Sequence, residues 1–175
     1  GAKTIAVNGM QRYDDAPLAM VKDANGNDVP DLAAGGRPYQ VINQDYLKEK
    51  DKDSNDFING ALANNNLLTG KLAGLNNATY ADALHLRPGV EIVSNAITNP
   101  GGDMVVQGDL DLSGFRYASL NAKTAKTGVY GSGEVGTLTL RAAGNLDIFG
   151  SINDGFALPP PTTDDKGWQL LAGRD

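Results

Sequence analysis

The chain has 175 residues, enough for one domain or for a domain with an appendage. Its net charge of −6 argues against nucleic acid and anionic membrane surfaces as partners, because both attract basic proteins. It contains no cysteine, which excludes disulfides and thiolate metal sites. The sequence opens "GAKTIAVNGM", without an initiator Met, and we expect it to be a fragment of a longer polypeptide.

Residues 1–50 predict an irregular segment of short strands and turns. Within it, "DANGND" (Asp23 to Asp28) places Asn and Gly, which tolerate left-handed backbone, between two apolar runs. The same letters are similar to a calcium-binding loop, but their Gly is at the fourth position instead of the sixth, and no Glu closes the loop. We therefore favour a solvated hairpin turn.

Residues 51–84 predict an amphipathic helical segment. Apolar residues recur there at spacings of three and four: Phe57, Ile58, Ala61, Leu62, Leu68, Leu72 and Leu75. Ser54 or Asn55 is the expected N-cap, and the charged stretch from Asp45 to Phe57 predicts a solvated helix end or loop. We expect the apolar stripe to dock on the rest of the same chain rather than on a partner helix.

Residues 85–157 predict short strands separated by glycine-containing turns: "VEIV", "DMVVQ", "DLDLSG", "TLTLRA" and "NLDIFG". Alternation in "LTLRA" puts Leu138 and Leu140 on one face of a strand. The stretches Gly102–Gly114 and Gly136–Gly150 share an order of side chains, which indicates an internal repeat. A loop is expected at 115–135.

Strands this short are barely stable as isolated hairpins, whereas stacked coils let each strand pair above and below. We therefore predict a mainly β fold, a right-handed parallel β-helix (solenoid) with a small α-helical N-terminal portion packed on it. The alternative is a small antiparallel sandwich, disfavoured because these turns lack hairpin dipeptides of the Asn-Gly kind. The tail at 158–175 contains three consecutive prolines, which cannot join a sheet interior.

Several stretches resemble filamentous-haemagglutinin-like exoproteins, the secreted partners of two-partner secretion systems in Gram-negative bacteria. The resemblance is carried by "LHLRPGVEI", "GDLDLSGFRYASL", "KTGVYGSGEVGTLTLRAAGNLDIFGSINDGF" and "DDKGW". It covers about Asn55 to Trp168, includes "ALANNNLL", and is weakest over residues 1–50. The sequence matches neither the toxin domain nor the N-terminal secretion-signal domain of that family.

The resemblance implies a late, non-toxin segment of a long surface filament, exported by an outer-membrane transporter and secreted or held at the cell surface. The family is known for adhesion and for contact-dependent growth inhibition. We accordingly expect a structural segment of a surface adhesin that extends or caps a β-helical filament. We expect no enzymatic activity, no cofactor, no metal and no nucleic-acid partner. A host or bacterial surface glycan or receptor is a possible ligand.

Two candidate chemistries come from the residues themselves. His85 is the only histidine, and we expect it to be structural, because the sequence supplies no neighbours for a catalytic or metal site. Asp109, Asp111 and Asp147 are expected to face outward, with Arg141 on a matching face. These four could act on or bind a polysaccharide, and a carbohydrate-binding or polysaccharide-active β-helix is the alternative function. We favour the simpler interpretation that they keep sheet edges soluble.

One locally basic and aromatic stretch stands out in the acidic chain. It contains Arg116, Tyr117, Lys123, Lys126 and Tyr130, which are the candidate ligand-binding residues for an anionic glycan or a partner. A loop that only covers a flank of the fold is the interpretation we prefer.

Overall fold

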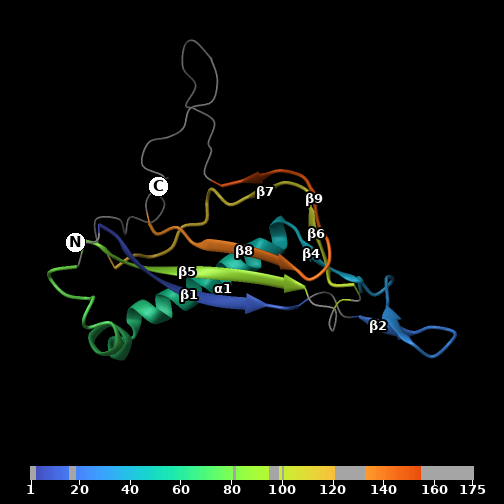
Figure 1. Cartoon of the computed structure of the whole chain (residues 1–175), viewed down its shortest axis with the longest axis horizontal. Helices are drawn as coiled ribbons and strands as arrows, with labels where there is room; N and C mark the ends of the chain where they lie inside the picture. The colour runs from blue at the N-terminus through green and yellow to red at the C-terminus, as the bar shows by residue number, and fades with distance from the viewer. Residues whose placement is uncertain are drawn as a thin grey trace, which may run out of the picture.

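The computed structural model describes residues 3–15, 19–80, 82–94, 99, 101–120 and 133–154. Its strands form four sheets, three of them parallel (Figure 1). The parallel sheets have the strand orders β1 (Ile5–Tyr13), β5 (Leu84–Ser94), β8 (Thr137–Ala142); β4 (Tyr39–Ile42), β6 (Asp103–Gln107), β9 (Leu146–Phe149); and β10 (Ile152–Asn153), β7 (Leu110–Asp111). The fourth sheet pairs β2 (Met20–Lys22) with β3 (Asp28–Pro30).

The chain runs through the parallel sheets three times, in the same order each time, and we call each run a pass. The first pass contains β1 and β4, the second contains β5, β6 and β7, and the third contains β8, β9 and β10. Each strand of the third pass pairs with its counterpart in the second, so that Ile92 is opposite Leu140 and Met104 is opposite Leu146. Apolar side chains of successive passes therefore lie side by side, and the strand segments expected around 103–107, 137–142 and 146–149 are confirmed.

The predicted fold class is nevertheless wrong. The chain is a mixed α/β protein with several small parallel sheets, and these sheets neither close nor curl into a β-helix. One departure from a regular coil is in the first pass, through β1 and β4, where α1 (Gln44–Ala63) follows β4 directly and β7 therefore pairs only with β10 among the described strands. The antiparallel sandwich does not describe it either, since β2 and β3 are the only antiparallel pair of strands among the described residues.

The two stretches predicted to form an internal repeat do not lie opposite each other in the sheets. The stretches 102–114 and 136–150 are not structural equivalents, because β6 pairs with β9 and β5 pairs with β8. Instead, hydrogen bonds between the last two passes join residues that are 42 positions apart in the sequence: Asp103 with Asn145, and Asp109 with Ser151. The similarity of the two stretches reflects the alternation of strands and turns, and this alternation occurs several times within a single pass.

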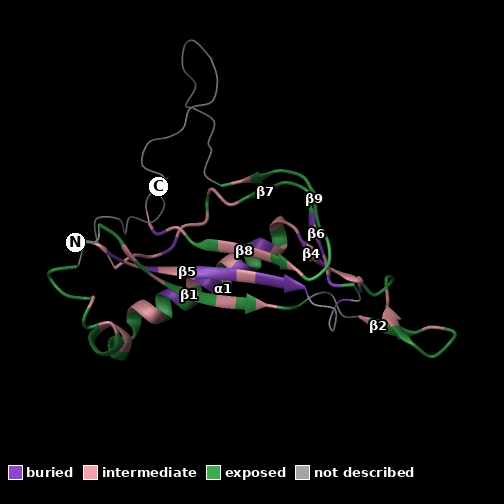
Figure 2. Ribbon diagram, in the orientation of Figure 1, coloured by how far each residue is buried: buried purple, intermediate pink, exposed green. Residues whose placement is uncertain are grey.

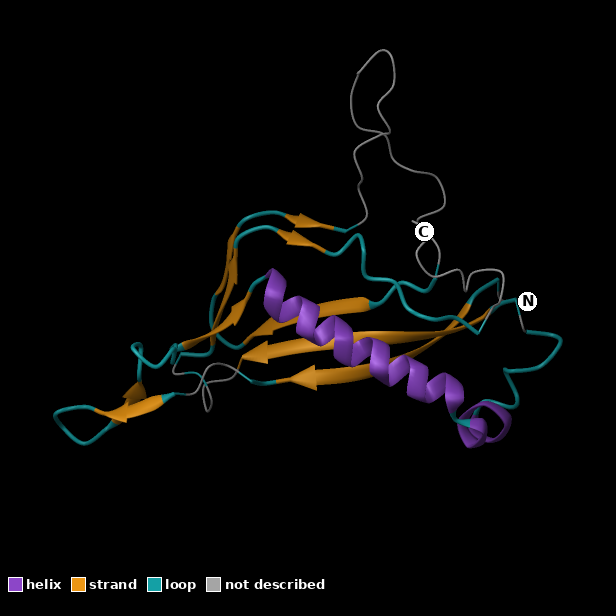
Figure 3. Cartoon of the chain, turned by 180° about the vertical axis from the view of Figure 1, so that it is seen from behind, coloured by secondary structure: helices purple, strands orange, loops and turns teal. Residues whose placement is uncertain are grey.

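Helix α1 is the longest element and begins earlier than expected. Asn43 caps it, with its side-chain Oδ1 accepting a hydrogen bond from the Tyr46 backbone N–H at 2.9 Å. The expected cap Ser54 lies inside the helix and is fully buried. A short π-helical turn, η1 (Asn66–Lys71), follows. Seen from behind, α1 crosses the sheet of β1, β5 and β8, and it contacts β5 (Figure 3).

The core lies between α1 and the parallel sheets. Strand β5 is buried along most of its length, between the more exposed strands β1 and β8 (Figure 2). The larger buried cluster joins helix and sheets and consists of Ile42, Leu47, Val90, Ile92, Met104, Val106 and Leu110. The smaller cluster consists of Ile58, Leu86 and Tyr117.

The expected hairpin turn at 23–28 is confirmed. Strands β2 and β3 pair antiparallel, and the Asp23 carboxylate accepts hydrogen bonds from the backbone N–H groups of Asn25 and Asn27 at 2.8 and 2.9 Å. Gly26 adopts φ of 81°, the left-handed conformation that glycine adopts without strain. The carboxylate that a calcium ion would need is therefore used by the turn itself.

Candidate functional site

A cavity of about 400 Å³ lies between α1 and the second and third passes of the chain. Helix α1 contributes Leu47, Lys50, Asp51 and Ser54, whose spacing of three and four places them on one helix face. Strands β5 and β8 and the segment around Phe115 form the other walls. The lining residues are Leu47, Lys50, Asp51, Ser54, Pro88, Val90, Leu112, Phe115, Arg116, Tyr117, Val135, Gly136, Thr137, Leu138, Leu140, Ile152 and Asp154.

The helix wall of this cavity carries two buried oxygen atoms without a hydrogen-bond partner, Asp51 Oδ1 and Ser54 Oγ. Burial raises the pKa of Asp51, and the nearby Tyr117 hydroxyl opposes that rise. The Tyr117 hydroxyl lies close to both residues and can donate to Asp51 while it accepts from Ser54, although neither contact is within strict hydrogen-bond geometry. We call Asp51, Ser54 and Tyr117 the polar corner of the cavity.

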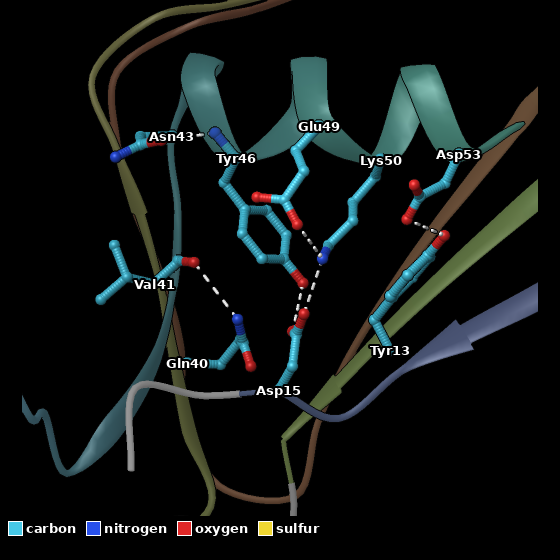
Figure 4. A network of polar contacts seen from close by, with 9 residues as sticks. All are labelled: Tyr13, Asp15, Gln40, Val41, Asn43, Tyr46, Glu49, Lys50 and Asp53. Carbon is cyan, nitrogen blue, oxygen red and sulfur yellow. Dashed lines mark hydrogen bonds and ion pairs between the residues drawn. The ribbon is translucent and has the colours of Figure 1, made fainter. Parts of the chain in front are cut away.

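Lys50, the residue before Asp51 in α1, occupies a cage of aromatic and acidic side chains (Figure 4). Its side chain is only 6% exposed, and Nζ lies 2.7 Å from Asp15 Oδ2 and 3.1 Å from Glu49 Oε1. The ammonium also lies 4.4 Å from the centre of the Tyr13 ring and 4.7 Å from that of Tyr46. Burial lowers the pKa of Lys50, but the hydrogen bonds to the two carboxylates raise it by more.

The cage fastens α1 to the end of β1. The Tyr46 hydroxyl donates to Asp15 Oδ1 at 2.5 Å, and the Tyr13 hydroxyl donates to Asp53 Oδ2 at 3.2 Å. Burial, followed by the negative charge of Asp53, raises the pKa of Tyr13 to about 12. Because Lys50 Nζ binds two carboxylates and lies against two aromatic rings, we assign the cage a structural role.

A second buried polar cluster surrounds Glu134, whose side chain is 4% exposed. Its carboxylate lies 2.6 Å from His85 Nδ1 and 3.0 Å from Arg87 Nε, and it accepts a hydrogen bond from Ser119 Oγ at 3.0 Å. Burial raises the pKa of Glu134, but the hydrogen bonds from His85, Arg87 and Ser119 outweigh burial and hold that pKa below its ordinary value. The backbone of Glu134 also bridges that of Tyr117.

These contacts are consistent with a structural role for His85, because its contact with Glu134 joins β5 to the segment that precedes β8. Glu134 was missed by sequence reasoning, because nothing local to it marks a partner 49 residues away. An ionised carboxylate can only accept hydrogen bonds, so His85 carries its proton on Nδ1.

The carboxylates of the polysaccharide hypothesis lie in separate sheets. Asp111 is in β7, Asp147 is in β9, and Arg141 is in β8, where its Nε pairs with Glu91 Oε1 at 2.9 Å. Asp109 accepts hydrogen bonds from Ser151, which lower its pKa. These residues are therefore not gathered into one site.

The basic aromatic stretch is described only in part. Arg116 and Tyr117 line the cavity, and Tyr117 is buried within the smaller core cluster. Arg116 Nη1 donates to the Phe115 carbonyl at 3.0 Å. Lys123, Lys126 and Tyr130 lie outside the described residues.

Within the described part of the chain, the third pass leaves an apolar edge that no further strand covers, which we call the open apolar edge. Strands β8 and β9 are the last described strands of their sheets, and β10 pairs only with β7. Four large apolar side chains of β9 and β10 are exposed: Leu146, Ile148, Phe149 and Ile152, with Phe149 reaching 67%. Monomeric proteins seldom leave unpaired strands with apolar side chains uncovered, so this edge is a candidate interaction surface.

Within the described ranges, no three His, Asp or Glu side chains are placed to hold a metal ion. None of the described helices is at once long and apolar enough to cross a membrane.

Comparisons with family models, with curated proteins and with solved structures gave no match to this chain.

Proposed function

We propose that this chain is a non-enzymatic structural segment of a large secreted surface adhesin, where it extends or caps the filament and supports adhesion. The observation that carries the proposal is the open apolar edge formed by β8, β9 and β10. The resemblance to filamentous-haemagglutinin-like exoproteins gives the class of parent protein in which such an edge has a use.

The physical basis is the pairing that already joins the second and third passes. Strand β6 is the one described partner of β9, so a further parallel strand could pair with the other side of β9 and cover Ile148 and Phe149. The edge is thus suited to continued growth of the sheets by strands of the parent polypeptide.

The proposed route to the surface is export of the parent by an outer-membrane transporter. The test is antibody labelling of intact Gram-negative cells that carry the parent gene, with an antibody raised against this chain. The proposal expects surface labelling that disappears when the transporter gene is deleted. Labelling only after permeabilisation, or surface labelling that persists without the transporter, would contradict it.

Adhesion in this proposal involves a surface glycan or receptor and the stretch that begins at Arg116. A glycan array probed with the chain tests this directly. Binding should fall when Lys123 and Lys126 are both replaced by Ala, and should persist when Lys48 and Lys52, exposed lysines of α1, are replaced together. Unchanged binding by the first double variant would remove that stretch as the adhesive surface.

The polysaccharide-active alternative has less support. Its carboxylates are divided among different sheets, and Asp109 and Asp111 accept hydrogen bonds from their own chain, at Ser151 and Ser113. Carbohydrate-cleaving sites need a pair of carboxylates flanking one bond, and the division of Asp111 and Asp147 between two sheets does not favour such a pair.

A further inference from the structure

The cavity under α1 has apolar walls that the described part of the chain leaves half-covered. Four of its lining residues pack against the larger core cluster and yet are only partly buried: Leu112, Phe115, Leu138 and Leu140. Ile152, another lining residue, is 43% exposed. The polar corner is served by its own tyrosine hydroxyl, so the apolar walls are the part of the cavity that calls for an occupant.

The cavity is also large for a space that adjoins a core. Protein interiors pack so closely that few voids exceed one water molecule, whose share of liquid volume is about 30 Å³. The space between the helix and the strands, at about 400 Å³, exceeds that many times over. Apolar walls that stay in contact with water forgo the free energy of burial. We therefore expect the occupant to be apolar.

The described part of the chain ends at the cavity itself. Asp154, its last residue, is one of the lining residues. Residues 155–175 follow directly and include Trp168, the only tryptophan of the chain. Leu170 and Leu171 come close behind Trp168. Trp168 follows Asp154 by 14 positions, and a chain of that length spans up to roughly 45 Å, so every wall of the cavity is within its reach.

We propose that this cavity binds the segment 168–171 of the same polypeptide, with the indole of Trp168 seated between α1 and β8. Tryptophan is among the side chains that bury the most apolar surface, which suits a cavity of this volume. The segment is tethered to a lining residue, and a tether gives it an effective concentration at the cavity that a free molecule lacks. Its docking completes the burial of Leu138 and Leu140.

The fluorescence of Trp168 tests the proposal on the whole chain, because no other tryptophan contributes to the emission. We expect the folded chain to emit at a shorter wavelength than the chain unfolded in urea, and to be quenched less by acrylamide. Emission and quenching equal to those of the unfolded chain would overturn the proposal. That result is also the one expected if Phe156 or Leu158, the apolar residues nearest to Asp154, filled the cavity instead.

The concentration of the protein separates docking within one chain from docking between copies. Because the segment and the cavity belong to one polypeptide, the emission wavelength should be the same at every concentration. A shift to shorter wavelength that appears only as concentration rises would assign Trp168 to a second copy and would overturn the proposal.

A pair of variants locates the indole. Leu138→Glu places a carboxylate in the cavity wall, so Trp168 should emit at a longer wavelength and be quenched more by acrylamide. Met20→Glu alters an exposed apolar residue of β2 that does not line the cavity, and as the matched control it should change neither property. Circular dichroism checks that both variants fold. A folded Leu138→Glu variant with unchanged emission would place the indole elsewhere and overturn the proposal.

Free indole tests the same contact without a change to the cavity walls, and it decides the matter if Leu138→Glu does not fold. Trp168→Ala removes the side chain that we place in the cavity, so indole should bind this variant more tightly than wild type in ligand-observed NMR. Equal affinity of indole for the two chains would overturn the proposal. None of these variants alters β9, so the results are independent of the proposed structural role.

Discussion

The carboxylate of Asp109 accepts hydrogen bonds from both the backbone N–H and the hydroxyl of Ser151, at 2.7 and 2.8 Å. The two residues are 42 positions apart and precede β7 and β10, which pair in parallel. Asp103 makes the same kind of contact with the backbone N–H of Asn145 at 2.7 Å, ahead of β9. Acidic side chains of the second pass therefore bind the turns of the third pass and fix the register between the two.

Replacing Asp109 by Ala should lower the thermal unfolding temperature. The substitution removes the acceptor for the Ser151 N–H, and Asp109→Asn should have a smaller effect because its amide oxygen can still accept. Asp147→Ala, an exposed carboxylate of β9, is the control and should change little. Equal unfolding temperatures for Asp109→Ala and Asp147→Ala would show that the contact does not hold the two passes together.

Glu134→Gln should destabilise the chain at neutral pH by roughly 1.5–3 kcal/mol, because it weakens charged hydrogen bonds to His85 and Arg87 in a buried setting. Glu91→Gln is the control, since the described partners of Glu91 are two largely exposed arginines, Arg12 and Arg141, and such pairs contribute little. Urea unfolding measures both.

The same cluster predicts an acid dependence. The pKa of Glu134 is lower in the folded chain than its ordinary value of 4.5, so its contribution to stability is complete above 4.5 and is lost as the pH falls through the folded-state pKa. The difference in unfolding free energy between wild type and Glu134→Gln should therefore shrink at acidic pH. A difference that stays constant with pH would contradict the assigned ionised state.

Lys50→Ala should also destabilise the chain by roughly 1.5–3 kcal/mol, through lost charged hydrogen bonds to Asp15 and Glu49. The loss of the contacts with the Tyr13 and Tyr46 rings adds to this effect. Lys48→Ala, an exposed lysine on the same helix, should stay within about 0.5 kcal/mol of wild type. Similar unfolding free energies for the two variants would exclude the cage as a fastening of α1.

The sequence predicted features that depend on near neighbours. Alternation located the strands around 103–107, 137–142 and 146–149, and the Asn-Gly pair located the turn between β2 and β3. These signals are local, because a strand or a hairpin turn is specified by a few consecutive residues.

Features that depend on distant residues were not predictable in this way. Alternation does not distinguish a closed coil from small separate sheets, so the fold class was wrong. The charged stretch from Asp45 was interpreted as solvated, yet it holds Lys50 in its cage and places Ser54 in the core. Asn43 was not recognised as the cap, because the apolar spacing that marks a helix is clearest only after residue 57.

In the proposed function, β8, β9 and β10 form an edge that further strands cover. Sedimentation of the isolated chain over a range of concentrations tests it, because an uncovered parallel edge with exposed apolar side chains will pair with another copy. The matched control is Met20→Lys with Val21→Lys, a pair of similarly exposed apolar residues on β2.

We predict that the wild-type chain and the Met20→Lys/Val21→Lys variant associate as concentration rises, whereas Ile148→Lys/Phe149→Lys remains monomeric. A wild-type chain that stays monomeric throughout, or association that is unaffected by the β9 substitutions, would contradict the claim.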